Sequence, residues 1–147
     1  MRAFGARLAQ ALGSSPPEQS FVITLSGDLG AGKTTLVSGL LSALGHAGPV
    51  RRPTYTLIEP YQLAGREVLH CDLYRLRHPD EIDDLGLRDL AGPGSVLVVE
   101  WPERAAGRFG EPDIALRLTY DGAGRACEVD ARTAAGKGLA NRFLGRT

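Results

Sequence analysis

A glycine-rich segment near the N-terminus has the residue types and the spacing of a phosphate-binding loop. It reads SGDLGAGKTTL and fits the pattern G-x-x-x-x-G-K-[ST] from Gly27 to Thr34. Its glycines allow backbone N–H groups to converge on phosphate oxygens at the N-terminus of the next helix. Lys33 adds a full positive charge, and Thr34 offers the hydroxyl oxygen that Mg²⁺ accepts as a ligand. The predicted phosphate-contacting residues are Asp28, Leu29, Gly30, Ala31, Gly32, Lys33, Thr34 and Thr35.

Lysine is rare in this chain, which contains two lysines and fifteen arginines. A compact ammonium on a flexible stem fits beside phosphates, where a broad guanidinium does not. The use of lysine at position 33 therefore favours a specific role in holding phosphate.

The apolar pattern places this loop between a strand and a helix. Residues 21–25 predict a buried strand, and the leucines of residues 33–44 lie on one face of a predicted helix. Further strands are expected at 54–63, 67–76, 95–100, 113–120 and 126–132, and further helices at 2–12, 79–90 and 134–144. The order of elements predicts an α/β fold, a P-loop NTPase-like mixed β-sheet flanked by helices. We expect one P-loop ATPase domain across residues 1–147.

Composition excludes a strongly basic nucleic-acid-binding protein. Seventeen basic and seventeen acidic residues give a net charge of zero and a pI near 6.8. No apolar run is long enough to span a bilayer, and the N-terminus lacks the pattern of a secretory signal. We therefore expect a cytoplasmic protein with no membrane contact.

Two acidic residues are candidates for the catalytic half of the site. Glu100 ends the apolar run of residues 95–100, and ligands of open α/β sheets bind beyond the carboxyl ends of strands. We predict that Glu100, with Thr34, serves Mg²⁺ and orients water; the alternative is a solvated acid at a strand end. Asp72 is the second candidate, and an ion pair with Arg75 or a neighbouring arginine is its alternative role.

Several neighbours of these acids have less specific patterns. Strand alternation places His70 on the same face as Asp72, where a hydrogen-bonded scaffold role is favoured over that of a base. Trp101 either stacks on the base or ribose of a nucleotide or packs against the fold. Thr54 and Thr56 are suited to sensing a γ-phosphate as a switch, and strand-edge threonines are the alternative.

Four ordered blocks, GDLGAGKTTL, PTYTLIEPY, HCDLYRL and VEWPE, resemble the TsaE (also called YjeE) family of bacterial P-loop ATPases. That family acts in the synthesis of threonylcarbamoyladenosine on tRNA. The resemblance implies ATP and Mg²⁺ as cofactors. It also implies that the chain docks on a complex of the TsaB and TsaD proteins and that ATP hydrolysis resets this complex. Contact with tRNA would then be indirect, through the complex. The family usually has serine where this chain has Arg52.

The same resemblance assigns roles to individual positions. Lys33 and Thr34 match positions that hold phosphate and Mg²⁺, and Glu100 matches one that serves Mg²⁺. Asp72 matches a residue needed for activity. Gly124-Arg125 resembles a Gly-Arg pair that lies late in the family's sequences. This resemblance implies that Arg125 approaches the nucleotide. The implied catalytic set is thus Lys33, Asp72 and Glu100.

Two other functions remain open from the sequence: a small-molecule P-loop kinase, and a nucleotide-gated binding module without useful catalysis. A guanine-specific GTPase is disfavoured, because the N-K-x-D motif needs Asn before Lys and the only asparagine, Asn141, precedes Arg142. We expect an ATPase that is weak alone and stimulated by partners, without tight tRNA binding by the isolated chain.

Overall fold

The computed structural model describes residues 1–50, 57–84, 86, 92–105, 107–108 and 110–145. Its helices are α1 (Arg2–Gly13), α2 (Lys33–Ala43), α3 (Glu81–Asp84), the 3-10 helix η1 (Pro102–Ala105) and α5 (Ala134–Phe143). Its strands are β1 (Phe21–Ser26), β2 (Ile58–Leu63), β3 (Arg66–Asp72), β4 (Val96–Glu100), β5 (Ile114–Asp121) and β6 (Gly124–Ala131).

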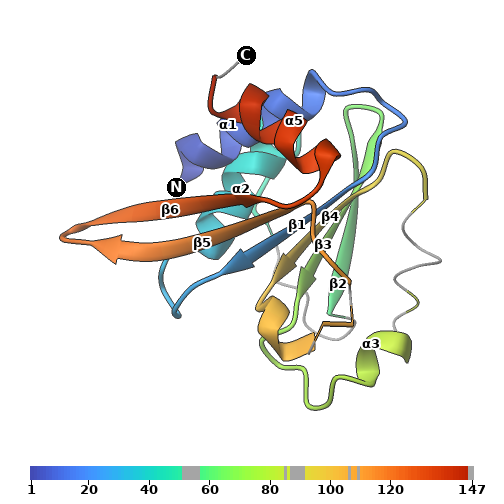
Figure 1. Cartoon of the computed structure of the whole chain (residues 1–147), viewed down its shortest axis with the longest axis vertical. Coiled ribbons are helices and arrows are strands. Elements are labelled where there is room, and N and C mark those ends of the chain that lie inside the picture. Colours follow the sequence, from blue (N-terminus) through green and yellow to red (C-terminus); the bar gives the residue numbers. More distant parts are fainter. Residues whose placement is uncertain (51–56, 85, 87–91, 106, 109, 146–147) are drawn as a thin grey trace.

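The strands form one mixed sheet in the order β2-β3-β4-β1-β5-β6 (Figure 1). Strand β1 lies inside the sheet and pairs in parallel with both β4 and β5. Antiparallel hairpins, β2–β3 and β5–β6, form the two edges. The predicted α/β fold with a mixed sheet is therefore confirmed, and the glycine-rich loop follows a central strand.

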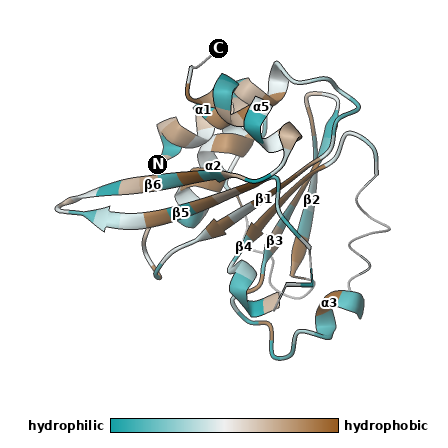
Figure 2. Ribbon diagram, in the orientation of Figure 1, coloured by the Kyte–Doolittle hydropathy of each residue, from teal (hydrophilic) through white to brown (hydrophobic). Residues whose placement is uncertain are grey.

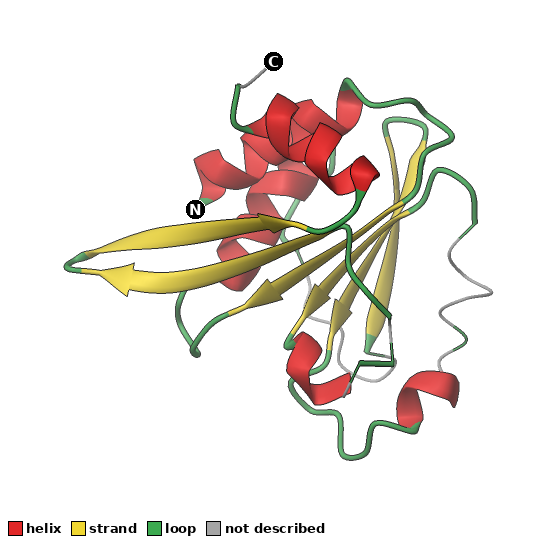
Figure 3. Ribbon diagram, viewed as in Figure 1, coloured by secondary structure: helices red, strands yellow, loops and turns green. Residues whose placement is uncertain are grey.

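Helices α1, α2 and α5 gather on one face of the sheet, whereas α3 and η1 lie near the end where β3 and β4 finish (Figures 1 and 3). Helices α1 and α2 cross closely. A Cβ on Gly5 would lie 2.1 Å from the carbonyl oxygen of Leu36, and one on Gly39 would lie 2.2 Å from that of Arg2. None of the described helices is long and apolar enough to cross a membrane.

Apolar side chains fill both faces of the central strands, which are the most hydrophobic part of the ribbon (Figure 2). Val96 and Val98 of β4 join the cluster beneath α1, α2 and α5. Leu97 and Val99 join a second cluster on the opposite face, which includes Ile82 of α3. Burial on both faces explains why β4 reads as a continuous apolar run that ends in one carboxylate.

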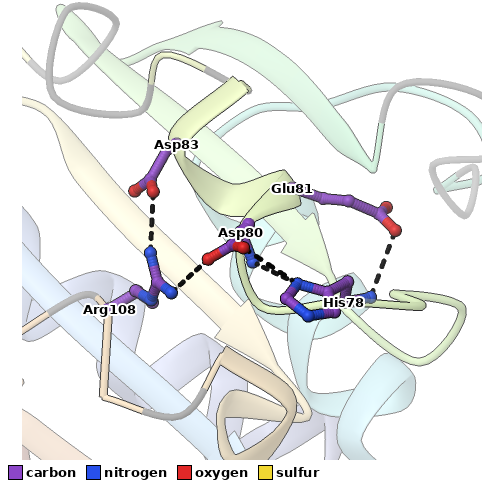
Figure 4. A network of polar contacts seen from close by, with 5 residues as sticks. All are labelled: His78, Asp80, Glu81, Asp83 and Arg108. Carbon is purple, nitrogen blue, oxygen red and sulfur yellow. Dashed lines mark hydrogen bonds and ion pairs between the residues drawn. The ribbon is translucent and has the colours of Figure 1, made fainter.

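A surface network joins α3 to the chain that follows η1 (Figure 4). Arg108 forms ion pairs with Asp80 and with Asp83, the latter at 2.7 Å. The Nδ1 atom of His78 lies 3.3 Å from a carboxylate oxygen of Asp80. The backbone N–H of His78 donates to the Glu81 carboxylate. The network therefore links the segments that follow β3 and β4, the strands that end in the two candidate acids.

The predicted elements are present among the described residues, with two corrections. The strand expected over residues 67–76 ends at Asp72, because the Asp72 carboxylate accepts the backbone N–H of Tyr74 and the chain turns there. A helix was expected over residues 79–90, but α3 is a single turn and Gly86 has a φ of 65°, which is not helical. Apolar spacing alone favours a longer helix, but glycine readily adopts the positive φ that is observed at Gly86. Residues 85 and 87–90 of that segment lie outside the described residues, as do Thr54 and Thr56.

Arg66, at the start of β3, is buried with 6% of its surface exposed. Its guanidinium donates hydrogen bonds to the backbone carbonyls of Ser15 (3.2 Å), Pro16 (2.6 Å), Gln19 (2.7 Å) and Gly94 (3.1 Å). Burial lowers the pKa of Arg66, and the carboxylate of Glu18 opposes that shift. One side chain thus connects the α1–β1 loop to β3 and to the start of β4.

Replacing Arg66 with methionine is predicted to lower the free energy of unfolding by roughly 2–4 kcal/mol, because four carbonyls lose a charged donor. Urea denaturation measures this change. The control is Arg132→Met, since Arg132 is exposed and pairs with Asp130 at the surface, where ion pairs contribute under about 1 kcal/mol. Equal losses in the two variants would contradict a connecting role for Arg66.

Candidate functional site

The glycine-rich loop joins the end of β1 to the start of α2. Its glycines adopt left-handed conformations, with φ of 142° at Gly27, 82° at Gly30 and 107° at Gly32. Gly32 is the N-cap of α2 and has no side chain, and the first turn of the helix contains no acidic residue. The positive N-terminus of α2 is thus presented to the site without a side-chain cap, as phosphate binding requires.

Lys33 is held by the loop that it belongs to. Its Nζ donates to the backbone carbonyls of Gly27 (2.5 Å) and Asp28 (3.0 Å) and lies 4.2 Å from the centre of the Trp101 ring. Burial lowers the pKa of Lys33, while nearby carboxylates, Glu100 first among them, oppose that shift. Since an ammonium has three N–H donors, one remains for a ligand in this position.

A hydrogen-bonded chain connects the loop to β4 and β3. Thr34 Oγ1 donates to Glu100 Oε1 at 3.2 Å, and the other carboxylate oxygen, Oε2, lies 2.6 Å from His70 Nε2. Glu100 is 2% exposed and His70 is fully buried. His70 and Asp72 share one face of β3, as predicted. His70 is buried on that face, whereas Asp72 is partly exposed.

The donor set at Thr34 and Glu100 fits Mg²⁺. Both offer hard oxygens, and Thr34 can give a lone pair to a metal while its hydrogen goes to Glu100. Within the described ranges, no group of three or more His, Cys, Asp or Glu side chains is arranged to hold a metal. Mg²⁺ needs no such group, because phosphates and water usually complete its octahedron.

These groups surround one cavity of about 130 Å³. It is lined by Leu29, Gly30, Gly32, Lys33, Thr34, Thr35, Asp72, Tyr74, Glu100 and Trp101. The structure thus brings together most of the residues predicted from the sequence. Asp28 lines a neighbouring cavity, Ala31 is buried beneath the loop, and Arg125 lies on β6.

Trp101 and Tyr74 form the rim on the β4 side of the loop. Their ring centres are 5.1 Å apart, and the Arg104 guanidinium lies 5.5 Å from the Tyr74 ring. Trp101 has a φ of 59°, which is unusual for a residue with a large side chain. This backbone turns the indole over Lys33, beside the phosphate-binding loop.

Tyr120 contacts the loop from the β5–β6 side, outside the residues that line the cavity, and was missed in the sequence. Its hydroxyl donates to the carbonyl of Leu29 at 3.4 Å, and the Arg125 guanidinium lies 4.1 Å from its ring centre. Tyr120 and Arg125 are partners across the β5–β6 hairpin, which continues past the last β1 pairing at Ser26. The turn residues at 121–124 predict a hairpin, and a hairpin with this turn places Tyr120 opposite Arg125.

Comparison with known families gives a match along most of the chain. A profile described as Threonylcarbamoyl adenosine biosynthesis protein TsaE matches residues 1–127. A tRNA threonylcarbamoyladenosine biosynthesis protein TsaE from Haemophilus influenzae is 41% identical over 143 residues, covering 97% of this chain and 90% of that protein. One from Streptomyces coelicolor is 39% identical over 141 residues, covering 94% and 91%.

A solved structure is similar as well. The crystal structure of YdiB from Bacillus subtilis superposes with a TM-score of 0.68 at 28% sequence identity. The match covers 97% of this chain and 88% of that chain. The similarity therefore extends over the sheet, the helices and the phosphate-binding loop together.

Replacing Gly27 with alanine is predicted to lower the free energy of unfolding by at least about 2 kcal/mol, because φ is positive and the clash is with backbone. A Cβ at this position would lie 2.4 Å from the carbonyl oxygen of Leu118. Thermal unfolding followed by circular dichroism measures the change. Gly13→Ala is the control, since a Cβ there meets no atom within 4 Å; a loss as large as that of Gly27→Ala would refute the argument.

Proposed function

The chain belongs to the TsaE family, and on that premise we propose that it binds and hydrolyses ATP with Mg²⁺ to support threonylcarbamoyladenosine modification of tRNA. The observation that carries the proposal is the convergence of Lys33, Thr34 and Glu100 on one cavity at the N-terminus of α2. The pairing of β1 with β4, the conformation of the loop and the direction of α2 together produce this arrangement.

The loop and Lys33 hold the phosphates in this proposal. Backbone N–H groups of the loop and of the first turn of α2 would bind phosphate oxygens, and Lys33 would add its positive charge to the same site. Thr34 and Glu100 would hold Mg²⁺, and the metal would supply positive charge beside the phosphate oxygens. The anionic ligand also favours the charged form of Lys33, which burial disfavours.

Asp72 is the residue that orients the attacking water in this proposal. Its Oδ1 accepts the backbone N–H of Tyr74 at 3.0 Å, which holds the carboxylate at the end of β3. Asp72 lies beside Glu100 in the register of β3 and β4 and lines the same cavity. It is also partly exposed, so that water can reach it.

The base of the nucleotide lies towards the β5–β6 hairpin. This hairpin stands on the opposite side of β1 from β4, and Arg125 stacks there on Tyr120 against the tip of the loop. Trp101 lies over Lys33, so its contact with the nucleotide is at the phosphate end. Trp101 and Tyr120 would thus contact opposite ends of the nucleotide.

The mouth of the site is a surface for partner proteins, which we propose to be TsaB and TsaD. Leu29, Tyr74 and Tyr120 are the large hydrophobic residues exposed in the described part of the chain, at 61%, 41% and 52%. All three adjoin the phosphate-binding loop. A partner that covers them would also shield the cavity from bulk solvent, so we expect hydrolysis to be slower in the chain alone than in the complex.

Hydrolysis of ATP is predicted to be slow for the isolated chain and to rise when TsaB and TsaD are added. Lys33→Met and Glu100→Gln are expected to reduce the stimulated rate about 10²-fold or more, because each removes charge from the phosphate and metal site. Phosphate release with Mg²⁺ and ATP measures these rates. The exposed residues Lys137 and Glu128 supply the matched controls, Lys137→Met and Glu128→Gln.

Each alternative function predicts a different result. A small-molecule kinase would transfer the γ-phosphate to a metabolite, and a binding module would support tRNA modification equally well with Glu100→Gln. Absence of ATP binding together with absence of partner-dependent hydrolysis would rule out the proposed function.

Asp72→Asn is predicted to separate hydrolysis from binding. The amide keeps the shape of the side chain but is a poor acceptor for a proton from water, so kcat is expected to fall about 10²-fold. Affinity for a nonhydrolysable ATP analogue should stay near that of the unmodified chain, as measured by calorimetry. A parallel loss of affinity and kcat would instead assign Asp72 to ligand binding.

A further inference from the structure

His70 is a fully buried polar residue in the middle of the sheet. In the parallel register of β3 and β4 it lies beside Val98, and the next pair on that face is Asp72 with Glu100. Because side chains alternate along strands, His70 and Glu100 both point to the face covered by α2. Val68 and Val98, their neighbours on that face, belong to the apolar cluster beneath the helices.

The contacts of Glu100 fix its carboxylate at both oxygens. Oε2 lies 2.6 Å from His70 Nε2, whereas Oε1 accepts the hydroxyl hydrogen of Thr34 at 3.2 Å. An ionised carboxylate only accepts hydrogen bonds, so Nε2 of the imidazole must carry the proton. Because His70 of β3 holds Oε2, the other oxygen, Oε1, is directed to Thr34 at the N-terminus of α2.

The other imidazole nitrogen, Nδ1, does not account for a histidine at this position. Nδ1 of His70 is buried, and none of the described residues gives it a hydrogen-bond partner. A buried polar atom without a partner is unfavourable, and an apolar residue at this position would avoid it. The contact between Nε2 and Glu100 is what distinguishes histidine from an apolar residue here.

We propose that His70 is a positioning residue for the metal site. Its Nε2–H holds Oε2 of Glu100, so that Oε1 stays beside Thr34 Oγ1, where the proposed Mg²⁺ is received. A residue of this kind sets the affinity for the metal without touching the nucleotide. The inference rests on the proposed function only for the identity of the ligand, because the contact between His70 and Glu100 exists without it.

The test compares two amide replacements that differ in reach. Glutamine places its N–H₂ near the position of Nε2, whereas the shorter asparagine places it near Nδ1 and cannot reach Glu100. His78→Asn is the matched control, since His78 is 67% exposed in the surface network. Binding of a fluorescent ADP analogue is titrated with Mg²⁺ for each variant, and its affinity is also measured in EDTA.

The expected result is specific to the metal. The Mg²⁺ concentration for half-maximal binding should rise about tenfold or more in His70→Asn. It should stay close to that of the unmodified chain in His70→Gln and His78→Asn, with equal affinity for the analogue in EDTA in all variants. Unchanged Mg²⁺ dependence in His70→Asn, or equal impairment in His70→Asn and His70→Gln, would overturn the proposal.

A measurement on the unmodified chain separates this proposal from the function that it deepens. Nitrogen-15 NMR of the His70 imidazole should show a proton on Nε2, with a signal that shifts in Glu100→Gln. An unprotonated Nε2 overturns the positioning role even if ATP binds. Failure of the chain to bind any nucleotide, together with a protonated Nε2 coupled to Glu100, refutes the proposed function and the metal role but leaves the contact itself standing.

Discussion

The parallel pairing of β1 with β4 is the constraint on which the site depends. Leu25 lies beside Glu100 in this register, and the N–H of Trp101 donates to the carbonyl of Leu25 at 3.2 Å. The glycine-rich loop begins two residues later, so its distance from Glu100 is set by the sheet. A shift of one residue in this pairing would turn Glu100 to the other face, away from Thr34.

Buried polar groups at this point support one another. Lys33, Glu100 and His70 are at most 5% exposed, yet they meet at the edge of an apolar core. Desolvation of Lys33 is offset by two loop carbonyls and by nearby carboxylates, and Glu100 is held by hydroxyl and imidazole donors. The polar groups of the site are therefore paired within the chain, and phosphate and metal would complete its charge balance.

The sequence was sufficient for features that depend on local pattern, and insufficient for those that depend on register. Glycine spacing predicted the loop, and an apolar run ending in an acid predicted Glu100. The partnership of His70 with Glu100 follows from the pairing of β3 with β4, and that of Tyr120 with Leu29 from a hairpin longer than β1. Neither length nor register is encoded in a single strand. Apolar spacing likewise predicted a helix through a position, Gly86, whose φ of 65° is not helical.

The central claim is that Thr34, Glu100 and Asp72 act on one Mg²⁺–ATP complex held by Lys33. A crystal structure with a nonhydrolysable ATP analogue and Mg²⁺ tests it most directly. We expect phosphates within the loop, metal on Thr34 Oγ1 and next to Glu100 Oε1, and His70 still bonded to Oε2. A metal bound away from Thr34 and Glu100, or an analogue bound outside the loop, would contradict this arrangement.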